Sequence, residues 1–114
     1  MLLNLLLALL LSACSAMPDI RVANFPKLET VVKVVEPGDI YQICAPMLGG
    51  YLKGILYLPM ACANVNLYTG KCTIYVTETS PPETVEHEKL HCLGYWHDDG
   101  LQLYYDEWKR GRPD

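Results

Sequence analysis

Positively charged side chains are few and scattered along this sequence. The 114 residues include 9 Lys and Arg against 13 Asp and Glu, so the formal net charge is −4. A surface that binds nucleic acid needs a basic patch or stripe, and the sequence contains no such cluster. The composition therefore argues against nucleic acid as a partner and indicates one mildly acidic domain.

Long apolar runs are also lacking, except at the N-terminus. The run "MLLNLLLALLLSAC" over residues 1–14 has the length of a signal peptide and is too short for a permanent transmembrane helix. The alternative is a buried N-terminal helix, but a stretch dominated by leucine has no polar face to turn toward solvent. A signal peptide over residues 1–13 is the favoured interpretation.

The end of this run, "LSAC", resembles the lipobox of bacterial lipoproteins, in which cleavage before the cysteine is coupled to acylation of its sulfur. The resemblance implies that Cys14 becomes the first residue of the mature chain and tethers it to a membrane. Ser15 follows, which in lipoproteins of two-membrane bacteria suggests transport to the outer membrane. The expected location is the cell envelope, with the domain on the periplasmic face.

The sequence lacks both CxxC pairs and CxH pairs, so zinc ligation by thiolates is the less favoured alternative. In an oxidising compartment the cysteines that follow Cys14 are expected to form disulfides, and three connectivities are possible. We favour Cys62 with Cys72 across a hairpin and Cys44 with Cys92, the second pair mainly by elimination.

The order of the remaining patterns predicts an α+β fold. Residues 14–29 contain two prolines and no sustained period, so we expect an acylated cysteine followed by a tether. The domain should occupy residues 30–114. "TVVKVVEPGDIYQIC" predicts a β-rich run, a Pro-Gly turn and a second short apolar segment, and "GILYLPMACANVN" with "KCTIYVTE" predicts a hairpin. This small antiparallel or mixed sheet should pack on one helix, with a short second helix at the C-terminus.

The segment "TSPPE", residues 79–83, predicts the start of that first helix. Ser80 can act as N-cap, Pro81 is tolerated at the first helical position, and Glu83 completes a Ser-x-x-Glu capping box. The helix should run to about Leu93 and end at Gly94, because glycine readily takes the left-handed conformation that follows a helix.

All three histidines of the chain lie in "VEHEKLHCLGYWHDD", with spacings of four and then six. His87 and His91 should project from one face of the helix, one turn apart, as two ligands of a single zinc must. A chain reversal at Gly94 would bring His97 toward them. Three nitrogen ligands leave the fourth tetrahedral position open, which is typical of catalytic zinc rather than structural zinc.

The pattern His87-Glu88-x-x-His91-x-x-Gly94-x-x-His97-Asp98 resembles the extended zinc signature of the metzincin metallopeptidases. The resemblance implies a minimal zincin-like domain that binds one Zn²⁺ through the three histidines. It further implies that Glu88 is the general base, Gly94 makes the turn and Asp98 is the acidic residue that follows the third ligand.

The methionine-bearing turn that metzincins place beneath the zinc is missing, since no methionine follows Met60. Asp98 or Asp99 should instead cap a short helix with one apolar face. That helix either forms a hydrophobic floor for the site or simply covers the domain. The apolar face consists of Leu101, Tyr104, Tyr105 and Trp108.

Zinc held by three neutral imidazoles lowers the pKa of its bound water, and Glu88 can take the proton as that water attacks a carbonyl. Residues 72–78, with Thr73 and Tyr75, are the expected substrate-binding edge strand. Tyr104 and the other aromatic residues near the C-terminus would line the cleft or pack in the core. The predicted function is a lipid-anchored zinc peptidase acting on envelope proteins or peptides. The alternative is a non-catalytic envelope lipoprotein that uses a zinc-stapled scaffold to bind a partner.

Overall fold

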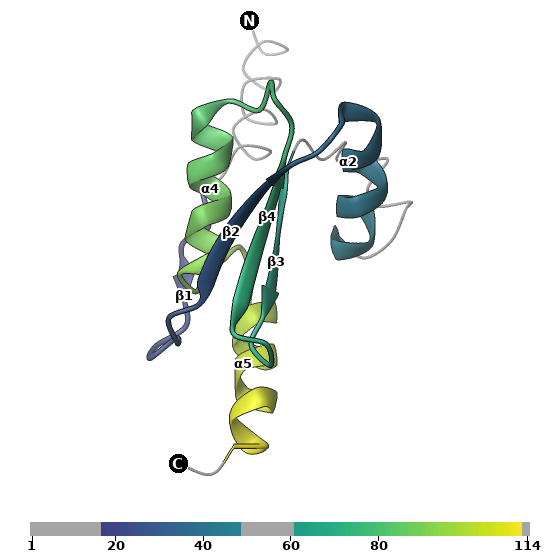
Figure 1. Cartoon of the computed structure of the whole chain (residues 1–114). Coiled ribbons are helices and arrows are strands. Elements are labelled where there is room, and N and C mark those ends of the chain that lie inside the picture. The colour runs from purple at the N-terminus through teal and green to yellow at the C-terminus, as the bar shows by residue number, and fades with distance from the viewer. Residues whose placement is uncertain (1–16, 49–60, 113–114) are drawn as a thin grey trace, which may run out of the picture.

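The computed structural model describes residues 17–48 and 61–112, and these form the α+β fold that the sequence predicts (Figure 1). Cys14 and the predicted signal peptide lie outside the described residues. None of the helices within the described ranges is long and apolar enough to cross a membrane. The elements in chain order are β1 (Ile20–Arg21), β2 (Glu29–Val34), α2 (Pro37–Cys44), the 3-10 helix η1 (Ala45–Leu48), β3 (Cys62–Asn66), β4 (Lys71–Val76), α4 (Pro82–Cys92), β5 (Tyr95–Trp96) and α5 (Gly100–Arg110).

The main sheet has three strands in the order β2-β4-β3, with β2 parallel and β3 antiparallel to β4. The predicted hairpin is confirmed for β3 and β4, whereas residues 54–60 lie outside the described residues. Its turn is built by Asn66, whose Oδ1 accepts the backbone N–H groups of Tyr68 and Thr69. Gly70 completes the turn at a φ of 72°, which a residue with a Cβ adopts only with strain.

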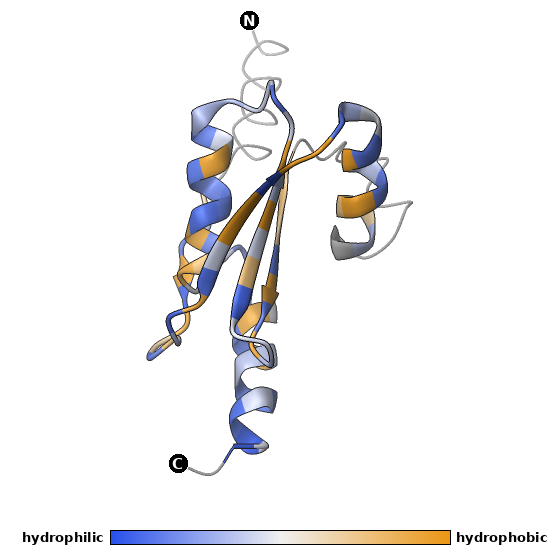
Figure 2. Cartoon of the chain, viewed as in Figure 1, coloured by the Kyte–Doolittle hydropathy of each residue, from blue (hydrophilic) through white to orange (hydrophobic). Residues whose placement is uncertain are grey.

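The two faces of this sheet bury different sets of side chains. Cys72, Ile74 and Val76 alternate along β4 and point to the α4 side, where Leu28, Ala63 and Trp108 complete the larger core. Tyr75 points to the other face, where it packs with Ile40, Cys44 and Cys62 beneath α2. Figure 2 shows hydrophobic residues along the strands and mainly hydrophilic residues along α5. Because successive side chains of a strand point to opposite faces, β4 contributes side chains to both cores.

The predicted disulfide pairing is wrong, although all four expected cysteines are paired. The bonds join Cys44 to Cys62 and Cys72 to Cys92. In the β3–β4 register Cys62 lies opposite Tyr75, and Cys72 lies opposite Val65. Cys62 and Cys72 therefore face opposite sides of the sheet and cannot meet. The observed bonds span sequence separations of 18 and 20, and closing loops of about that length stabilises a fold by about 3 kcal/mol each.

Two further expectations about the N-terminal half need correction. The expected Pro-Gly turn is the first turn of α2, since Pro37 occupies a helix start where its missing N–H costs nothing. The expected tether is part of the domain from at least β1, which pairs antiparallel with β5. Val22 is 1% exposed, and its N–H donates to the carbonyl of Gly94. The segment before β2 thus supports the turn that follows α4.

Candidate metal centre

Helix α4 carries His87 and His91 on one face, as predicted, and packs against β3 and β4. Its start differs from the expected capping box. The N-cap is Pro81, which makes no side-chain capping bond, and the Oγ of Ser80 accepts the N–H of Thr77 at 2.9 Å. The helix ends at Cys92, whose disulfide to Cys72 fixes this end of α4 to the central strand. The bond lies one residue beyond His91 and so restrains the backbone of α4 at that histidine.

Gly94 makes the predicted turn, and the structure gives two reasons for glycine there. Its φ is +99°, a conformation that residues with a Cβ rarely adopt. A Cβ built at this position would lie 2.7 Å from the Cγ of Phe25. The turn leads into β5 and then to His97, so a side chain at position 94 would disturb the segment that carries the third histidine.

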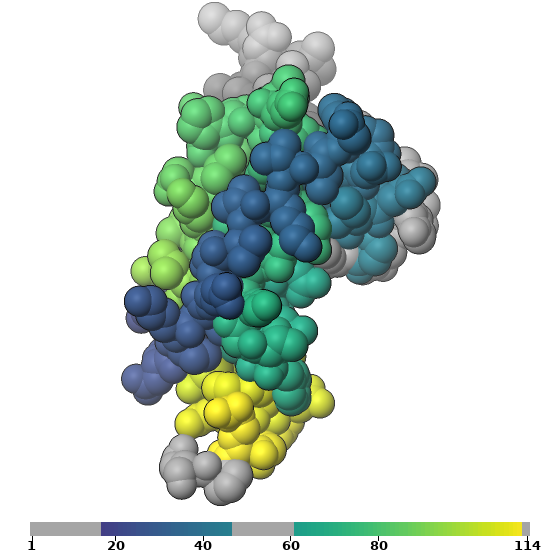
Figure 3. Space-filling model, viewed as in Figure 1, coloured from purple at the N-terminus to yellow at the C-terminus, as the bar shows by residue number. Residues whose placement is uncertain are grey.

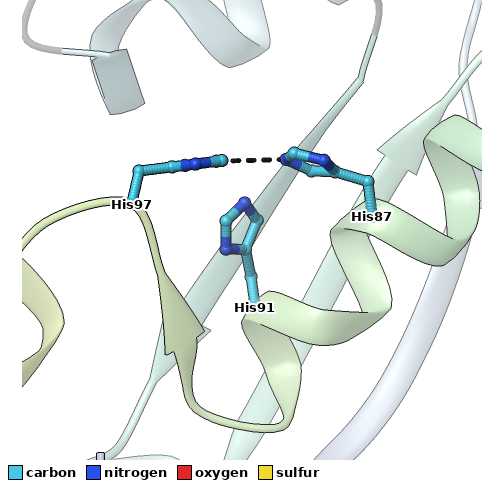
Figure 4. A group of neighbouring side chains, drawn as sticks. All are labelled: His87, His91 and His97. Carbon is cyan, nitrogen blue, oxygen red and sulfur yellow. Dashed lines mark hydrogen bonds between the residues drawn. The ribbon is translucent and has the colours of Figure 1, made fainter. Parts of the chain in front are cut away.

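The three histidines converge, as Figure 4 shows. The Nε2 atoms of His87 and His97 are 3.1 Å apart. Two nitrogen ligands of a tetrahedral zinc are expected about 3.3 Å apart. One ligand atom from each histidine can be chosen so that all lie within 4.8 Å of one another, and this group can hold a metal ion. Among the described residues no Cys, Asp or Glu joins the group as a fourth ligand.

His91 is held in place by its surroundings. Its Nδ1 lies 2.9 Å from the carbonyl oxygen of Tyr95. Because a carbonyl only accepts, Nδ1 carries the proton and Nε2 is left with its lone pair for a metal. The ring packs on Trp96, with the centroids 4.4 Å apart. These contacts fix the tautomer and the ring orientation before any metal binds.

Burial also keeps His87 and His91 in the form that a metal requires. It lowers the pKa of His91 to about 4, with smaller contributions from the neighbouring histidines. The pKa of His87 is lowered as well, by burial first and by the charge of His97 second. Only neutral imidazole binds a metal, so His91 needs no deprotonation at neutral pH.

Glu88 lies beside the histidines and is only 7% exposed. Its Oε2 is 4.0 Å from the Nε2 of His91, the atom left free for a metal. Burial raises the pKa of Glu88 to about 7. Because His91 is neutral at this pH, the contact is not an ion pair. A carboxyl group with a pKa near neutrality can take up and release a proton under physiological conditions.

A hollow of about 350 Å³ is lined in part by Trp96, the residue that packs on His91. It is bordered by the edge strand β3, by Trp96 and by the start of α5. Its walls include Ala63, Asn64, Val65, Trp96, Leu101 and Tyr104. Trp96 thus contacts both the hollow and the histidine group. It packs on His91 and directly precedes His97.

The prediction that residues 72–78 form an edge strand that binds substrate is wrong, because β4 is not at an edge of the sheet. β4 is the central strand, so its backbone groups pair with β2 on one side and β3 on the other. Tyr75 packs on the α2 face, and Thr73, two residues earlier, shares that face. Neither candidate lies on the α4 side. Tyr104 does line the hollow, although its hydroxyl accepts the N–H of Leu67 at 3.0 Å and is thereby held in the hairpin turn.

The C-terminal helix is confirmed as α5, and the carboxylate of Asp98 accepts the N–H of Gly100 at its start. Trp108 belongs to the larger core, and Tyr104 and Tyr105 pack against that core, so this helix covers the domain. The aromatic ring that packs directly on a histidine is Trp96 instead. The sequence reasoning did not assign this contact or the Tyr95 carbonyl. The only available signal was that both residues immediately precede His97.

Comparison with family models, with curated proteins and with solved structures finds no match to this chain.

Proposed function

We propose that this chain is a zinc-dependent peptidase. The observation that carries the proposal is the convergence of three histidine side chains beside the buried carboxyl group of Glu88. Three imidazole nitrogens suit zinc, and a set of three protein ligands leaves one position for water or substrate. When bound there, zinc would lower the pKa of a water molecule and polarise a substrate carbonyl.

Glu88 is the proposed general base. Its Oε2 lies 4.0 Å from the Nε2 of His91, close enough to reach a water that a metal there would bind, and Glu88 is not part of the three-histidine group. Its burial excludes bulk water, so a proton that it accepts stays in the site. Glu88 can then pass this proton to the leaving amine, which completes hydrolysis of a peptide bond.

The proposed substrate is an extended peptide lying along β3. β3 has β4 on one side only, so its outer edge is available to an added strand among the described residues. A peptide on that edge would gain main-chain hydrogen bonds from the strand and side-chain contacts from the hollow. Trp96 and Leu101, which line the hollow, would favour an apolar substrate side chain next to the scissile bond.

The proposed setting is the cell envelope, with acyl chains on Cys14 as the anchor. This part of the proposal rests on the lipobox-like "LSAC". Two disulfides in a domain of this size are consistent with an oxidising compartment. The substrates would then be envelope proteins or peptides.

The second candidate is a non-catalytic lipoprotein in which zinc only stabilises the fold and a partner protein binds near the metal. The small hollow favours it, since about 350 Å³ is near the lower end for small-molecule sites. Such a protein would not need an acid-base residue beside its ligands.

Hydrolysis of a peptide library by the purified full-length chain tests the proposal. We expect cleavage that stops when zinc is removed by a chelator and returns when zinc is added. Cleavage that persists in the metal-free chain would contradict a zinc mechanism. A zinc-loaded chain that cleaves nothing in a broad library would favour the second candidate.

A further inference from the structure

Strand β2 is an edge strand with an apolar sequence and little cover. Five of its six residues are exposed, and Val32 and Val34 keep 45% and 61% of their surface in solvent. In Figure 3 the residues of β2, in blue, lie at the front surface of the molecule. β4 pairs with one side of β2, and no described strand pairs with the other. Such an edge is a template for a further strand.

The hydrogen bonds to β4 determine which residues of β2 are available for that strand. The N–H of Glu29 donates to Gly70, and the N–H of Val35 donates to Val76. In a parallel pair, alternate residues direct both backbone groups to the same neighbour. The odd-numbered residues of β2 therefore face β4. Thr30, Val32 and Val34 direct their N–H and C=O groups to the open edge.

We propose that this edge pairs with β2 of a second copy of the chain. An antiparallel pair about a two-fold axis must bring even-numbered residues opposite even-numbered ones. A register in which Val31 lies opposite Val31 of the second copy satisfies this condition. It places Thr30 opposite Val32 of the second copy, and the backbone N–H of each of these two residues donates to the C=O of the other. The same register places Glu29 opposite Lys33 of the second copy, and this pair occurs twice. The two copies of β2 therefore place opposite charges next to each other in this register.

The exposed valines fit the same arrangement. A two-fold axis perpendicular to the sheet keeps the two α4 helices on one side. Val32 pairs with Ile74, whose side chain points toward α4, so Val32 and Val34 lie on this side. The valines of both copies would then form one apolar strip across the junction, and Lys33, which alone would discourage edge pairing, would be neutralised by Glu29.

The metal centre would remain open in this dimer. The hollow beside the histidines lies at β3, the opposite edge of the three-stranded sheet. Joining two β2 strands gives a six-stranded sheet whose two outer edges are the β3 strands. The proposal therefore does not depend on the peptidase function, and loss of zinc should leave the dimer intact.

Charge reversal tests the register. Lys33→Glu places two carboxylates opposite each other at both ends of the junction, so the dissociation constant of the dimer should rise by about tenfold or more. The double variant Glu29→Lys with Lys33→Glu restores opposite charges and should restore the dimer. Lys27→Glu makes the same change in net charge outside β2 and should have no effect. Sedimentation velocity of the full-length chain in detergent micelles measures these constants.

Cysteine cross-linking tests the same register without changing charge. In a Cys14→Ser background, Val31→Cys brings two cysteines directly opposite each other at a Cα separation of about 4.5 Å, within the range of a disulfide. Val34→Cys is the matched control, since its two copies would be about 20 Å apart. We expect a covalent dimer from the first variant only. A wild-type chain that is monomeric at all concentrations, or a dimer that Lys33→Glu leaves unchanged, would overturn the proposal.

Discussion

Replacing Glu88 by Gln is expected to leave zinc binding intact and to lower peptide hydrolysis by at least about a hundredfold, the contribution of a positioned general base. Gln has nearly the same volume as Glu and keeps its hydrogen-bonding capacity, but it cannot accept the proton. Glu88 does not belong to the group of residues whose ligand atoms converge, which consists of His87, His91 and His97. In this variant the zinc content should therefore stay at the wild-type level while the rate of hydrolysis falls.

Glu86→Gln is the matched control for this experiment. This substitution makes the same chemical change on the same helix, but the side chain of Glu86 is 68% exposed and pairs with Lys89. Hydrolysis by this variant should equal that of the wild type. If Glu88→Gln hydrolyses peptide at the wild-type rate with full zinc content, Glu88 is not the base and the non-catalytic candidate gains support.

Replacing His91 by Ala is expected to abolish stoichiometric zinc binding. His91 is the most buried of the three histidines and the one whose orientation is fixed by Tyr95 and Trp96. Loss of a group that only hydrogen-bonds to a metal ligand typically lowers metal affinity by about 10- to 100-fold, so loss of the ligand itself should exceed that range. Zinc per chain by elemental analysis and affinity by competition with a chromophoric chelator measure the effect.

The His91→Ala chain should still fold. His91 belongs to neither hydrophobic core, and both disulfides lie outside its ring contacts. Helical content and the disulfide mass should match those of Lys89→Ala, a control on the exposed side of α4. Full zinc content in a folded His91→Ala chain would refute the three-histidine site.

The local parts of this structure could be predicted because local sequence determines them. The spacing of four between His87 and His91 fits one helix face, and Gly94 marks the helix end through its backbone freedom. The β3–β4 hairpin follows from two β-rich runs with a short polar turn between them. These features need no knowledge of what packs against them.

The errors concern features that depend on contacts between distant segments. The disulfide pairing depends on the face to which each cysteine points, and a strand sequence alone does not give the register that decides this. The position of β4 in the centre depends on the parallel pairing of β2, which lies about 40 residues earlier in the chain. The supposed tether carries Val22 and Phe25, which become buried or half-buried through contacts with distant segments, among them the turn at Gly94 and, for Phe25, the larger core.

Anomalous diffraction at the zinc edge from crystals of the zinc-loaded chain tests the central claim most directly. The account predicts one strong peak per chain, about 2.1 Å from the Nε2 atoms of His87, His91 and His97. It also predicts a fourth position that no protein atom fills and that faces Glu88. A peak elsewhere in the chain, or a fourth protein ligand that closes the site, would contradict an open three-histidine centre.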